Sequence, residues 1–549
     1  MSFHVLPCAY PWTPDQGDGT FRNPILCADY SDPDVIRHGE DFYLTASSFN
    51  CTPGLPILHS RDLVNWTLVN HALKNLPDER YCEVQPGCGV WAPALRFHAG
   101  RFWIFFPTPD EGIYVTTASH PAAEWSPPQL VQAGKGLIDP CPLWDDDGQA
   151  HLVHAYAHSR SGLKHMLRVR PMAPDGSRLL GEGQVVFHDP VRHPTLEGPK
   201  FLKKDGWYYI LAPAGGVQTG WQVVLRSRNI YGPYEDKIVL AQGRTPVNGP
   251  HQGALVDLPN GEWWFVHFQD AGVYGRITHL QPVQWQDGWP LMGINQDANG
   301  TGEPALHFQK PCRRRGDESL TGSGKRKTES GKQSDTPHVV SYGIDGGSAA
   351  VPQTSDEFDS PRLGLQWQWQ ANHEAGWCAL DQRPGWLRLF AQPLTIGDLG
   401  RTPNLLLQKF PARTFAVETR LEFAPQSLGE ETGLVVTGRA HAALALRRSE
   451  PGTQVIFRHD GAESVLAETS GQPVSFRLRV GDGGLCQFSF AMADREWTVV
   501  PEKFQAQPGV WIGAKVGLYA ITTSEGQGGC ADFDYVRFLP AGNSVSNGG

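Results

Sequence analysis

DGWYYILAP, residues 205–213, combines a tight Asp-Gly turn with a strand rich in aromatic and branched side chains. An Asp-Gly or Asn-Gly turn beside such a run is the strongest local signal for a β-hairpin. The N-terminal part of the chain contains this pattern five times: HGEDFYLTAS at 38–47, AGRFWIFFP at 99–107, DGQAHLVHAY at 147–156, DGWYYILAP at 205–213 and NGEWWFVHF at 260–268. The pattern indicates a repeated β-unit.

Each turn also follows an apolar stretch, so the repeating unit is strand, turn, strand. The turn glycines lie 48 to 61 residues apart, at positions 39, 100, 148, 206 and 261. Repeats of this length are typical of propeller blades, whereas a β-sandwich gives shorter and more even spacing. The sequence therefore predicts an all-β fold that begins with a five-bladed β-propeller over residues 20–308.

One residue with a distinctive side chain opens the strand before each turn. These residues are Asp32, Trp91, Asp139, Glu197 and His251. Because the innermost strand of each blade lines the central channel, we expect the five side chains to converge near the propeller axis. Carboxylates brought together in a partly desolvated place repel and shift each other's pKa values. Such an arrangement is best explained by a chemical role.

The composition changes after the fifth repeat. Residues 309–355 are rich in Gly, Ser, Lys and Arg and poor in apolar residues, which predicts a linker. Two basic clusters within it, 313–315 and 325–327, have no interleaved aromatic residues, so a solvated linker is favoured over a nucleic-acid patch. Over residues 356–540, short runs of alternating apolar and polar residues, such as TQVIFRHD and VSFRLRV, predict a β-sandwich.

Composition excludes several kinds of partner. The 549 residues include 47 basic and 57 acidic side chains, and the net charge of −10 argues against nucleic-acid binding. No apolar run reaches the roughly 18 residues of a membrane-spanning helix. The N-terminal residues lack the features of a signal peptide, and the ten cysteines have no metal-binding spacing. We therefore expect a cytoplasmic protein with free thiols, and the sequence leaves open whether it forms a homo-oligomer.

Residues 23–75 resemble the opening of glycoside hydrolase family 43. Four further stretches are similar to later motifs of that family and follow in the same order: GVWAPALRF at 89–97, GLIDPCPLWDDDG at 136–148, LEGPKFLKKDGWYY at 196–209 and GRITHLQPVQWQDGWP at 275–290. Residues 355–540 resemble the concanavalin-like jelly-roll sandwich that follows the propeller in the β-xylosidase branch. The resemblance covers nearly all of the propeller and the sandwich.

The resemblance implies an inverting reaction. Such a hydrolase needs a carboxylate that deprotonates water and a carboxylic acid that protonates the leaving oxygen, about 6.5–9.5 Å apart. By motif position, Asp32 in SDPDVI corresponds to the general base and Glu197 in LEGPKF to the general acid. Asp139 in IDPCPLW corresponds to the residue that orients the acid and tunes its pKa. Asp34 is a nearby competitor for the base, and residues 145–147 are expected to form only a hairpin turn.

The resemblance also implies residues that contact the sugar. Arg276 corresponds to an arginine that reaches substrate hydroxyls, and Phe49 and Trp91 correspond to aromatic walls of the sugar subsite. A surface ion pair and core packing are the respective alternatives. His251 corresponds to a histidine beneath the sugar that holds calcium in several members, although a hard cation prefers oxygen ligands and a buried structural histidine is the alternative. Cys51 departs from the family pattern and leaves the shape of the pocket open.

Together these features predict an inverting exo-glycoside hydrolase that needs no cofactor and releases xylose from non-reducing ends of β-1,4-xylo-oligosaccharides. An α-L-arabinofuranosidase is the nearest alternative, because arabinofuranose presents similar hydroxyl geometry. A non-catalytic sugar-binding protein would lack the base or the acid, and an interaction scaffold would leave the carboxylates unexplained. An exo-acting enzyme must close one side of its site, so we expect a loop of the sandwich to fold over the propeller. A sandwich on a flexible tether is the alternative.

Overall fold

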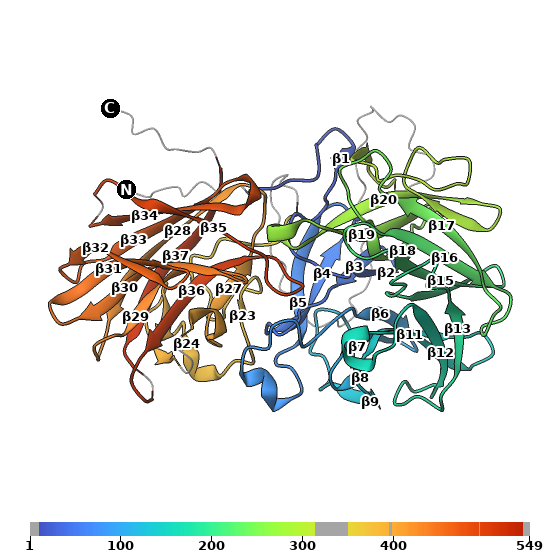
Figure 1. Cartoon of the computed structure of the whole chain (residues 1–549), viewed down its shortest axis with the longest axis horizontal. Helices are drawn as coiled ribbons and strands as arrows, with labels where there is room; N and C mark the ends of the chain where they lie inside the picture. The colour runs from blue at the N-terminus through green and yellow to red at the C-terminus, as the bar shows by residue number, and fades with distance from the viewer. Residues whose placement is uncertain (1–9, 313–349, 395–397, 494, 527, 542–549) are drawn as a thin grey trace, which may run out of the picture.

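The computed structural model describes residues 10–312, 350–394, 398–493, 495–526 and 528–541. Two β-rich bodies lie side by side in it (Figure 1). Helices are short in these ranges: α1 (His158–Ser161) and the 3-10 turns η1 (Glu79–Cys82), η2 (Gly272–Tyr274), η3 (Ala375–Trp377), η4 (Leu399–Arg401) and η5 (Asp482–Gly484). The all-β prediction is confirmed, and none of the described helices is long and apolar enough to cross a membrane.

Five antiparallel sheets of four strands form the predicted propeller, and each strand pairs with the next one in the chain. The first two blades contain β2 (Asp34–His38), β3 (Asp41–Thr45), β4 (Gly54–Ser60), β5 (Trp66–Leu73), β6 (Ala94–His98), β7 (Arg101–Thr108), β8 (Gly112–Ala118) and β9 (Gln129–Ala133). The other three contain β10 (Leu137–Trp144), β11 (Ala150–Tyr156), β12 (Met166–Met172), β13 (Gln184–His188), β14 (Lys200–Lys204), β15 (Trp207–Ala214), β16 (Trp221–Ser227), β17 (Glu235–Ala241), β18 (His251–Asp257), β19 (Trp263–Asp270), β20 (Arg276–Gln286) and β21 (Trp289–Met292).

The repeated glycine occupies the same place in every blade, in the turn between the first and second strands. Its φ is +62°, +75°, +82°, +72° and +90° in the five blades, in chain order. This left-handed conformation is open to glycine and strained for residues with a Cβ. The repeat therefore predicted the blades because the turn geometry itself requires glycine.

The ring closes through hydrogen bonds and apolar packing. β1 (Thr20–Arg22) pairs with β22 (His307–Gln309), which joins the two ends of the propeller segment. A buried cluster packs the fifth blade on the first, with Val256 and Trp264 on one side and Phe42 on the other. The first inner strand is thereby fixed beside the last.

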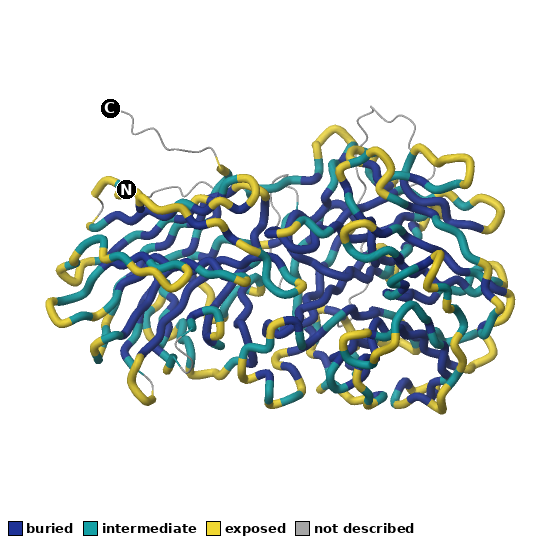
Figure 2. Tube along the Cα trace, viewed as in Figure 1, coloured by how far each residue is buried: buried dark blue, intermediate teal, exposed yellow. Residues whose placement is uncertain are grey.

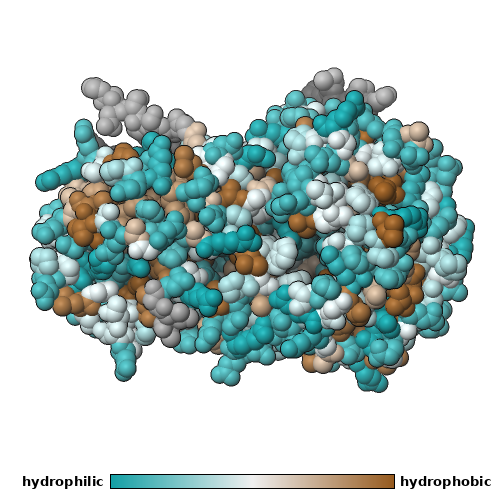
Figure 3. Space-filling model, viewed as in Figure 1, coloured by the Kyte–Doolittle hydropathy of each residue, from teal (hydrophilic) through white to brown (hydrophobic). Residues whose placement is uncertain are grey.

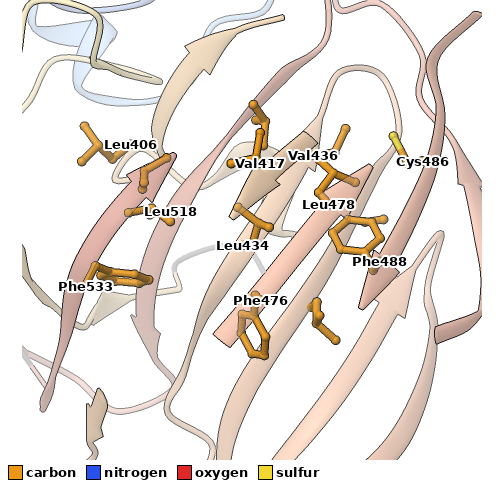
Figure 4. Packing of buried hydrophobic residues seen from close by; sticks show 14 of the residues in the cluster. Leu406, Val417, Leu434, Val436, Phe476, Leu478, Cys486, Phe488, Leu518 and Phe533 are labelled. Carbon is orange, nitrogen blue, oxygen red and sulfur yellow. The ribbon is translucent and has the colours of Figure 1, made fainter. Parts of the chain in front are cut away.

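The second body is the predicted sandwich of two sheets. In order, one sheet contains β23 (Gln368–Trp369), β27 (Leu406–Lys409), β36 (Lys515–Thr522), β29 (Glu431–Thr437), β30 (His441–Ser449), β31 (Gly452–His459) and β32 (Ala462–Thr469), with β26 (Gln392–Pro393) beside β36. The other contains β24 (Cys378–Ala379), β25 (Leu387–Phe390), β37 (Cys530–Pro540), β28 (Phe415–Ala424), β33 (Val474–Val480), β34 (Leu485–Met492) and β35 (Thr498–Gln505). Leu434, Phe476, Leu518 and Phe533 pack in the core of this body (Figure 4).

The sandwich is docked on the propeller. Thr52 and Trp369 exchange two backbone hydrogen bonds of 3.0 and 2.6 Å across the junction. The Asn372 amide donates to the carbonyl oxygen of Leu76 at 3.0 Å and accepts from its N–H at 2.7 Å. Val273 of the propeller belongs to the sandwich's core cluster. These contacts confirm docking and contradict a flexible tether.

Buried segments follow the strands of both bodies, and exposed segments are mostly the connecting loops (Figure 2). The face seen in Figure 3 is largely hydrophilic, with small groups of hydrophobic residues over both bodies. Eight cysteines of the described ranges are free thiols: Cys27, Cys51, Cys82, Cys88, Cys141, Cys378, Cys486 and Cys530. Most of the predicted linker, including both basic clusters, lies outside the described residues.

Candidate active site

A pocket of ≈ 390 Å³ lies where the inner strands of the blades converge. Its lining includes six of the residues singled out from the sequence: Asp32, Phe49, Trp91, Asp139, Glu197 and Arg276. The first five come from four different blades or the segments that lead into them, and Arg276 begins β20 of the fifth blade. The five-fold register thus brings together side chains that are far apart in the sequence.

Asp32 is held by three donors. Its Oδ2 accepts hydrogen bonds of 2.6 Å from the hydroxyls of Ser31 and Ser47. The Nη1 of Arg276 lies 3.3 Å from its Oδ1 and also donates to the Ser31 hydroxyl at 2.9 Å. Only 5% of Asp32 is exposed, so these contacts fix the carboxylate in one orientation at the pocket wall.

Asp139 is a buried acid beside another acid. Its Oδ2 accepts a hydrogen bond of 2.8 Å from the backbone N–H of Gly198. Burial, followed by the negative charge of Glu197, raises the pKa of Asp139 from 3.8 to about 7, and Asp32 adds to the effect. Because charge repulsion disfavours two ionised carboxylates in one desolvated place, a proton is retained here close to neutral pH.

Glu197 reaches the pocket from the segment before β14. Its backbone N–H donates to the carbonyl oxygen of Pro213 at 3.1 Å, while 27% of its side chain is exposed. Its Oε1 lies 3.2 Å from the Nε2 of His251. His251 itself is fully buried and is not part of the pocket lining, so the structure places it behind Glu197 rather than against a bound sugar.

The described residues contain no group of three or more His, Cys, Asp or Glu side chains that could hold a metal ion. The Nδ1 of His251 is buried without a hydrogen-bond partner, and its Nε2 faces Glu197. A lone imidazole does not supply the oxygen ligands that calcium prefers. The donor set therefore does not fit direct calcium binding, and calcium near His251 stays an untested prediction.

Four aromatic side chains line the pocket, Phe49, Trp91, Tyr156 and Trp511, and three of them lie close together. The Trp91 Nε1 donates to the carbonyl oxygen of Gly87 at 3.1 Å, and the Trp91 ring lies 6.5 Å from that of Phe49. The third ring is Trp511 of the sandwich, 6.5 Å from Trp91 and 48% exposed. The expected sandwich loop is therefore present over the propeller pocket.

Gln252 also lines the pocket, although sequence reasoning missed it. Only 4% of the residue is exposed, and its Nε2 is buried without a hydrogen-bond partner. A buried amide donor without a partner costs about 1–3 kcal/mol, which a ligand hydroxyl could offset. The nearest signal in the sequence was its neighbour His251. Gln252 itself has a left-handed backbone (φ +36°) at a register shift of β18 between His251 and Gly253, which regular strand alternation does not predict.

Six non-glycine residues of the pocket lining have a left-handed backbone: Asp32 (φ +54°), Phe49 (+51°), Asp139 (+55°), Thr195 (+55°), Gln252 (+36°) and Trp511 (+66°). Non-glycine residues in this region cost about 1–3 kcal/mol each and cluster at functional sites. The strained backbone conformations therefore occur in the same pocket as Asp139, the acid whose pKa is raised.

The competing residues have structural roles. Asp34 accepts hydrogen bonds from the Leu95 N–H at 2.6 Å and from Arg96 at 2.8 Å, and it does not line the pocket. Asp145 accepts from the Tyr208 hydroxyl at 2.5 Å in the turn between β10 and β11, and it does not line the pocket. Cys51 is buried against Lys515 of the sandwich, so this departure from the family pattern lies at the domain junction.

Comparison with known proteins agrees with this geometry. Residues 21–290 match glycosyl hydrolases family 43, and residues 355–539 match the beta xylosidase C-terminal concanavalin A-like domain. A putative beta-xylosidase of Xylanibacter ruminicola is 38% identical over 92% of this chain and 86% of its own length. The chain therefore belongs to glycoside hydrolase family 43 and is a β-xylosidase-like hydrolase.

Two further proteins are similar to this chain, one compared by sequence and one by structure. The non-reducing end alpha-L-arabinofuranosidase BoGH43B of Bacteroides ovatus is 30% identical over 76% of this chain and 73% of its own length. The crystal structure of the GH43 BlXynB protein from Bacillus licheniformis superposes with a TM-score of 0.77 at 25% identity, covering 95% of this chain and 99% of that one. The two-body architecture is thus shared with a solved structure.

We expect Asp139→Asn to change how stability depends on pH. An acid whose pKa is raised in the folded state binds its proton more tightly there, so the free energy of unfolding falls as pH rises from about 4 through about 7. The variant lacks this loss and should gain ~2–4 kcal/mol relative to wild type between pH 5 and pH 8. Urea unfolding of the variant and of wild type at pH 5 and pH 8 measures this gain in the free energy of unfolding.

The control is Asp145→Asn. Hydrogen bonds from Lys203 and Tyr208 outweigh burial and lower the pKa of Asp145, so its removal should give no such gain at pH 8. Parallel stability curves for wild type and Asp139→Asn would contradict the buried-acid interpretation.

Proposed function

We propose that this chain is an inverting exo-β-1,4-xylosidase that releases xylose from the non-reducing ends of xylo-oligosaccharides. The observation that carries the proposal is the meeting of Asp32, Asp139 and Glu197 in one pocket that Trp511 covers from the sandwich. Family membership and the similarity to a putative beta-xylosidase support the hydrolytic class. The linkage, the sugar and the stereochemistry belong to the proposal.

Asp32 serves as the general base. The two serine hydroxyls donate to its Oδ2 and Arg276 to its Oδ1, and these contacts fix the orientation of the carboxylate. The carboxylate accepts a proton from a water molecule, and the water oxygen attacks the anomeric carbon from the face opposite the leaving group. The anomeric configuration is therefore inverted.

Glu197 serves as the general acid, and Asp139 as its positioning partner. Burial, followed by the negative charge of Glu197, raises the pKa of Asp139, so Asp139 keeps a proton near neutral pH beside the acid. His251 Nε2, 3.2 Å from Oε1, orients the Glu197 carboxyl from behind. The acid donates its proton to the glycosidic oxygen as the C–O bond breaks.

The other residues of the pocket lining bind the sugar. Arg276 and the unpartnered Gln252 amide supply donors for hydroxyls, and Phe49 and Trp91 supply apolar faces for the ring. Trp511 limits the pocket on the sandwich side, so that only a terminal sugar enters. An α-L-arabinofuranosidase activity is the second candidate, because BoGH43B shares 30% identity with this chain.

We expect measurable hydrolysis of an aryl β-D-xyloside, with a higher kcat/KM than for the matched aryl α-L-arabinofuranoside. An NMR time course should show α-xylose as the first sugar released, because water attacks once and inverts the centre. Early formation of β-xylose would exclude Asp32 as a general base. Turnover of neither glycoside would refute the proposal, and preference for the arabinoside would establish the second candidate.

Variants of the base and of the acid should differ in how their loss of kcat depends on the substrate. Asp32→Asn should lose about 10²–10⁴-fold in kcat on every substrate, because no other group activates the water. Glu197→Gln should lose a similar factor on xylobiose but less than about tenfold on an aryl xyloside with a good leaving group, which needs little protonation. Steady-state kinetics on both substrates give the comparison.

Asp147→Asn is the matched control, since Asp147 lies in the hairpin turn and is exposed. Its kinetics should equal those of wild type. Equal losses for Glu197→Gln on both substrates would argue against the acid role.

Trp511→Ala should raise KM for xylobiose about tenfold and open the pocket to longer chains, because it removes the aromatic wall contributed by the sandwich. Trp386→Ala is the control, since Trp386 is another half-buried tryptophan of the sandwich that does not line the pocket. Product profiles on xylohexaose should show internal cleavage only in the first variant. Unchanged KM and products would mean that the sandwich does not shape the site.

A further inference from the structure

A second cavity, of ≈ 500 Å³, lies at the junction of the two bodies. The propeller contributes Asn50, Cys51 and Gly87 to its wall. The sandwich contributes turns that face the propeller, including residues 437–441 and η4. Its volume is in the range of small-molecule sites. It also exceeds the volume of the pocket lined by Asp32, Asp139 and Glu197, which we call the carboxylate pocket.

One loop separates the two spaces. Val510 and Ile512 line the junction cavity, while Trp511 between them lines the carboxylate pocket. The backbone N–H of Arg439 donates to the carbonyl oxygen of Pro508 at 3.1 Å and anchors the loop. A molecule in the junction cavity would therefore contact this loop from the side opposite the catalytic pocket.

Positive charge in this cavity lacks a partner. Arg401 and Arg439 lie at the solvent-exposed mouth of the cavity, and their guanidinium groups make no hydrogen bond or ion pair within the described part of the chain. Lys515 is 5% exposed, and its Nζ donates only to the Sγ of Cys51, at 2.8 Å. An ammonium buried against a thiol, without a carboxylate, is poorly compensated.

A second lysine, Lys409, lies close enough to Lys515 to feel its charge. Burial, followed by the charge of Lys515, lowers the pKa of Lys409 to about 8. The charge of Asp29 acts on Lys409 in the opposite direction, and its carboxylate accepts hydrogen bonds of 2.9 Å from the backbone N–H groups of Arg276 and Gly513. Neither lysine therefore has a carboxylate within ion-pair distance in the described part of the chain.

The two carboxylates of the cavity wall have local partners. Asp398 accepts from the Gly400 N–H at 2.9 Å and lies 3.7 Å from His441, whose pKa is lowered by burial, so the contact is one with a neutral imidazole near neutral pH. Asp460 lies 3.8 Å from its neighbour His459. The free donors in this cavity thus belong to cations, and arginine pairs best with a planar carboxylate, which it binds bidentately.

We propose that the junction cavity binds a carboxylate-bearing sugar, a hexuronate, with its carboxylate on Arg401 and Arg439 and a ring face against Val510 and Ile512. The apolar pair gives the ring a surface, and the polar wall matches its hydroxyls. The site is separate from the carboxylate pocket and does not depend on the proposed hydrolytic function.

Calorimetric titration of the full-length protein with D-glucuronate tests the proposal, with D-glucose as the neutral analogue. We expect one site per chain for glucuronate, at least tenfold weaker binding of glucose, and no displacement of glucuronate by saturating D-xylose. Arg401→Gln and Arg439→Gln should each weaken glucuronate binding at least tenfold. Arg448→Gln, an exposed arginine of the same domain outside the cavity, should leave it unchanged.

Three outcomes would overturn the proposal: no binding of glucuronate, equal binding of glucose, or equal affinity in Arg401→Gln and wild type. Displacement by xylose would also overturn it, because it places glucuronate in the carboxylate pocket. Melting temperatures without ligand show whether each variant is folded. Since hydrolysis of aryl xylosides is measured separately, failure of this proposal and failure of the proposed function are distinguishable.

Discussion

Packing of the fifth blade on the first is the contact on which the site depends. Val256 and Trp264 bury apolar surface against the first blade, and β1 pairs with β22 to fasten the ring. Removal of apolar surface from water drives this closure, and the hydrogen bonds fix its register. Only in the closed ring can Arg276, from the last blade, lie 3.3 Å from Asp32, at the start of the first.

The closed ring also supports features that oppose stability. Asp139 is buried beside Glu197, and six non-glycine residues of the pocket lining have left-handed backbones. Each feature costs free energy, and each persists only where surrounding packing over-determines the conformation. The rigid inner strands therefore allow acids to meet in an arrangement that an isolated hairpin could not hold.

A single carboxylate links the propeller site to the sandwich. Asp29 accepts the backbone N–H of Arg276 through one oxygen and that of Gly513 through the other, both at 2.9 Å. Gly513 follows the loop that carries Trp511, so the Asp29 carboxylate holds both Arg276 and this loop. Trp511 covers the pocket, and the junction cavity lies behind its loop, because the two bodies are docked. The sandwich is therefore part of the site's architecture.

The sequence by itself determined the blades and the acids. Turn glycines need φ above zero, and the strand register that follows them repeats, so Asp32, Asp139 and Glu197 could be placed near the axis from spacing and motif order. Only the tertiary structure decided that Gln252 rather than His251 lines the pocket, that Trp511 covers it, and that Cys51 meets Lys515. The physical reason is that these outcomes depend on a local left-handed backbone and on docking between segments hundreds of residues apart, which no short-range pattern of residues encodes.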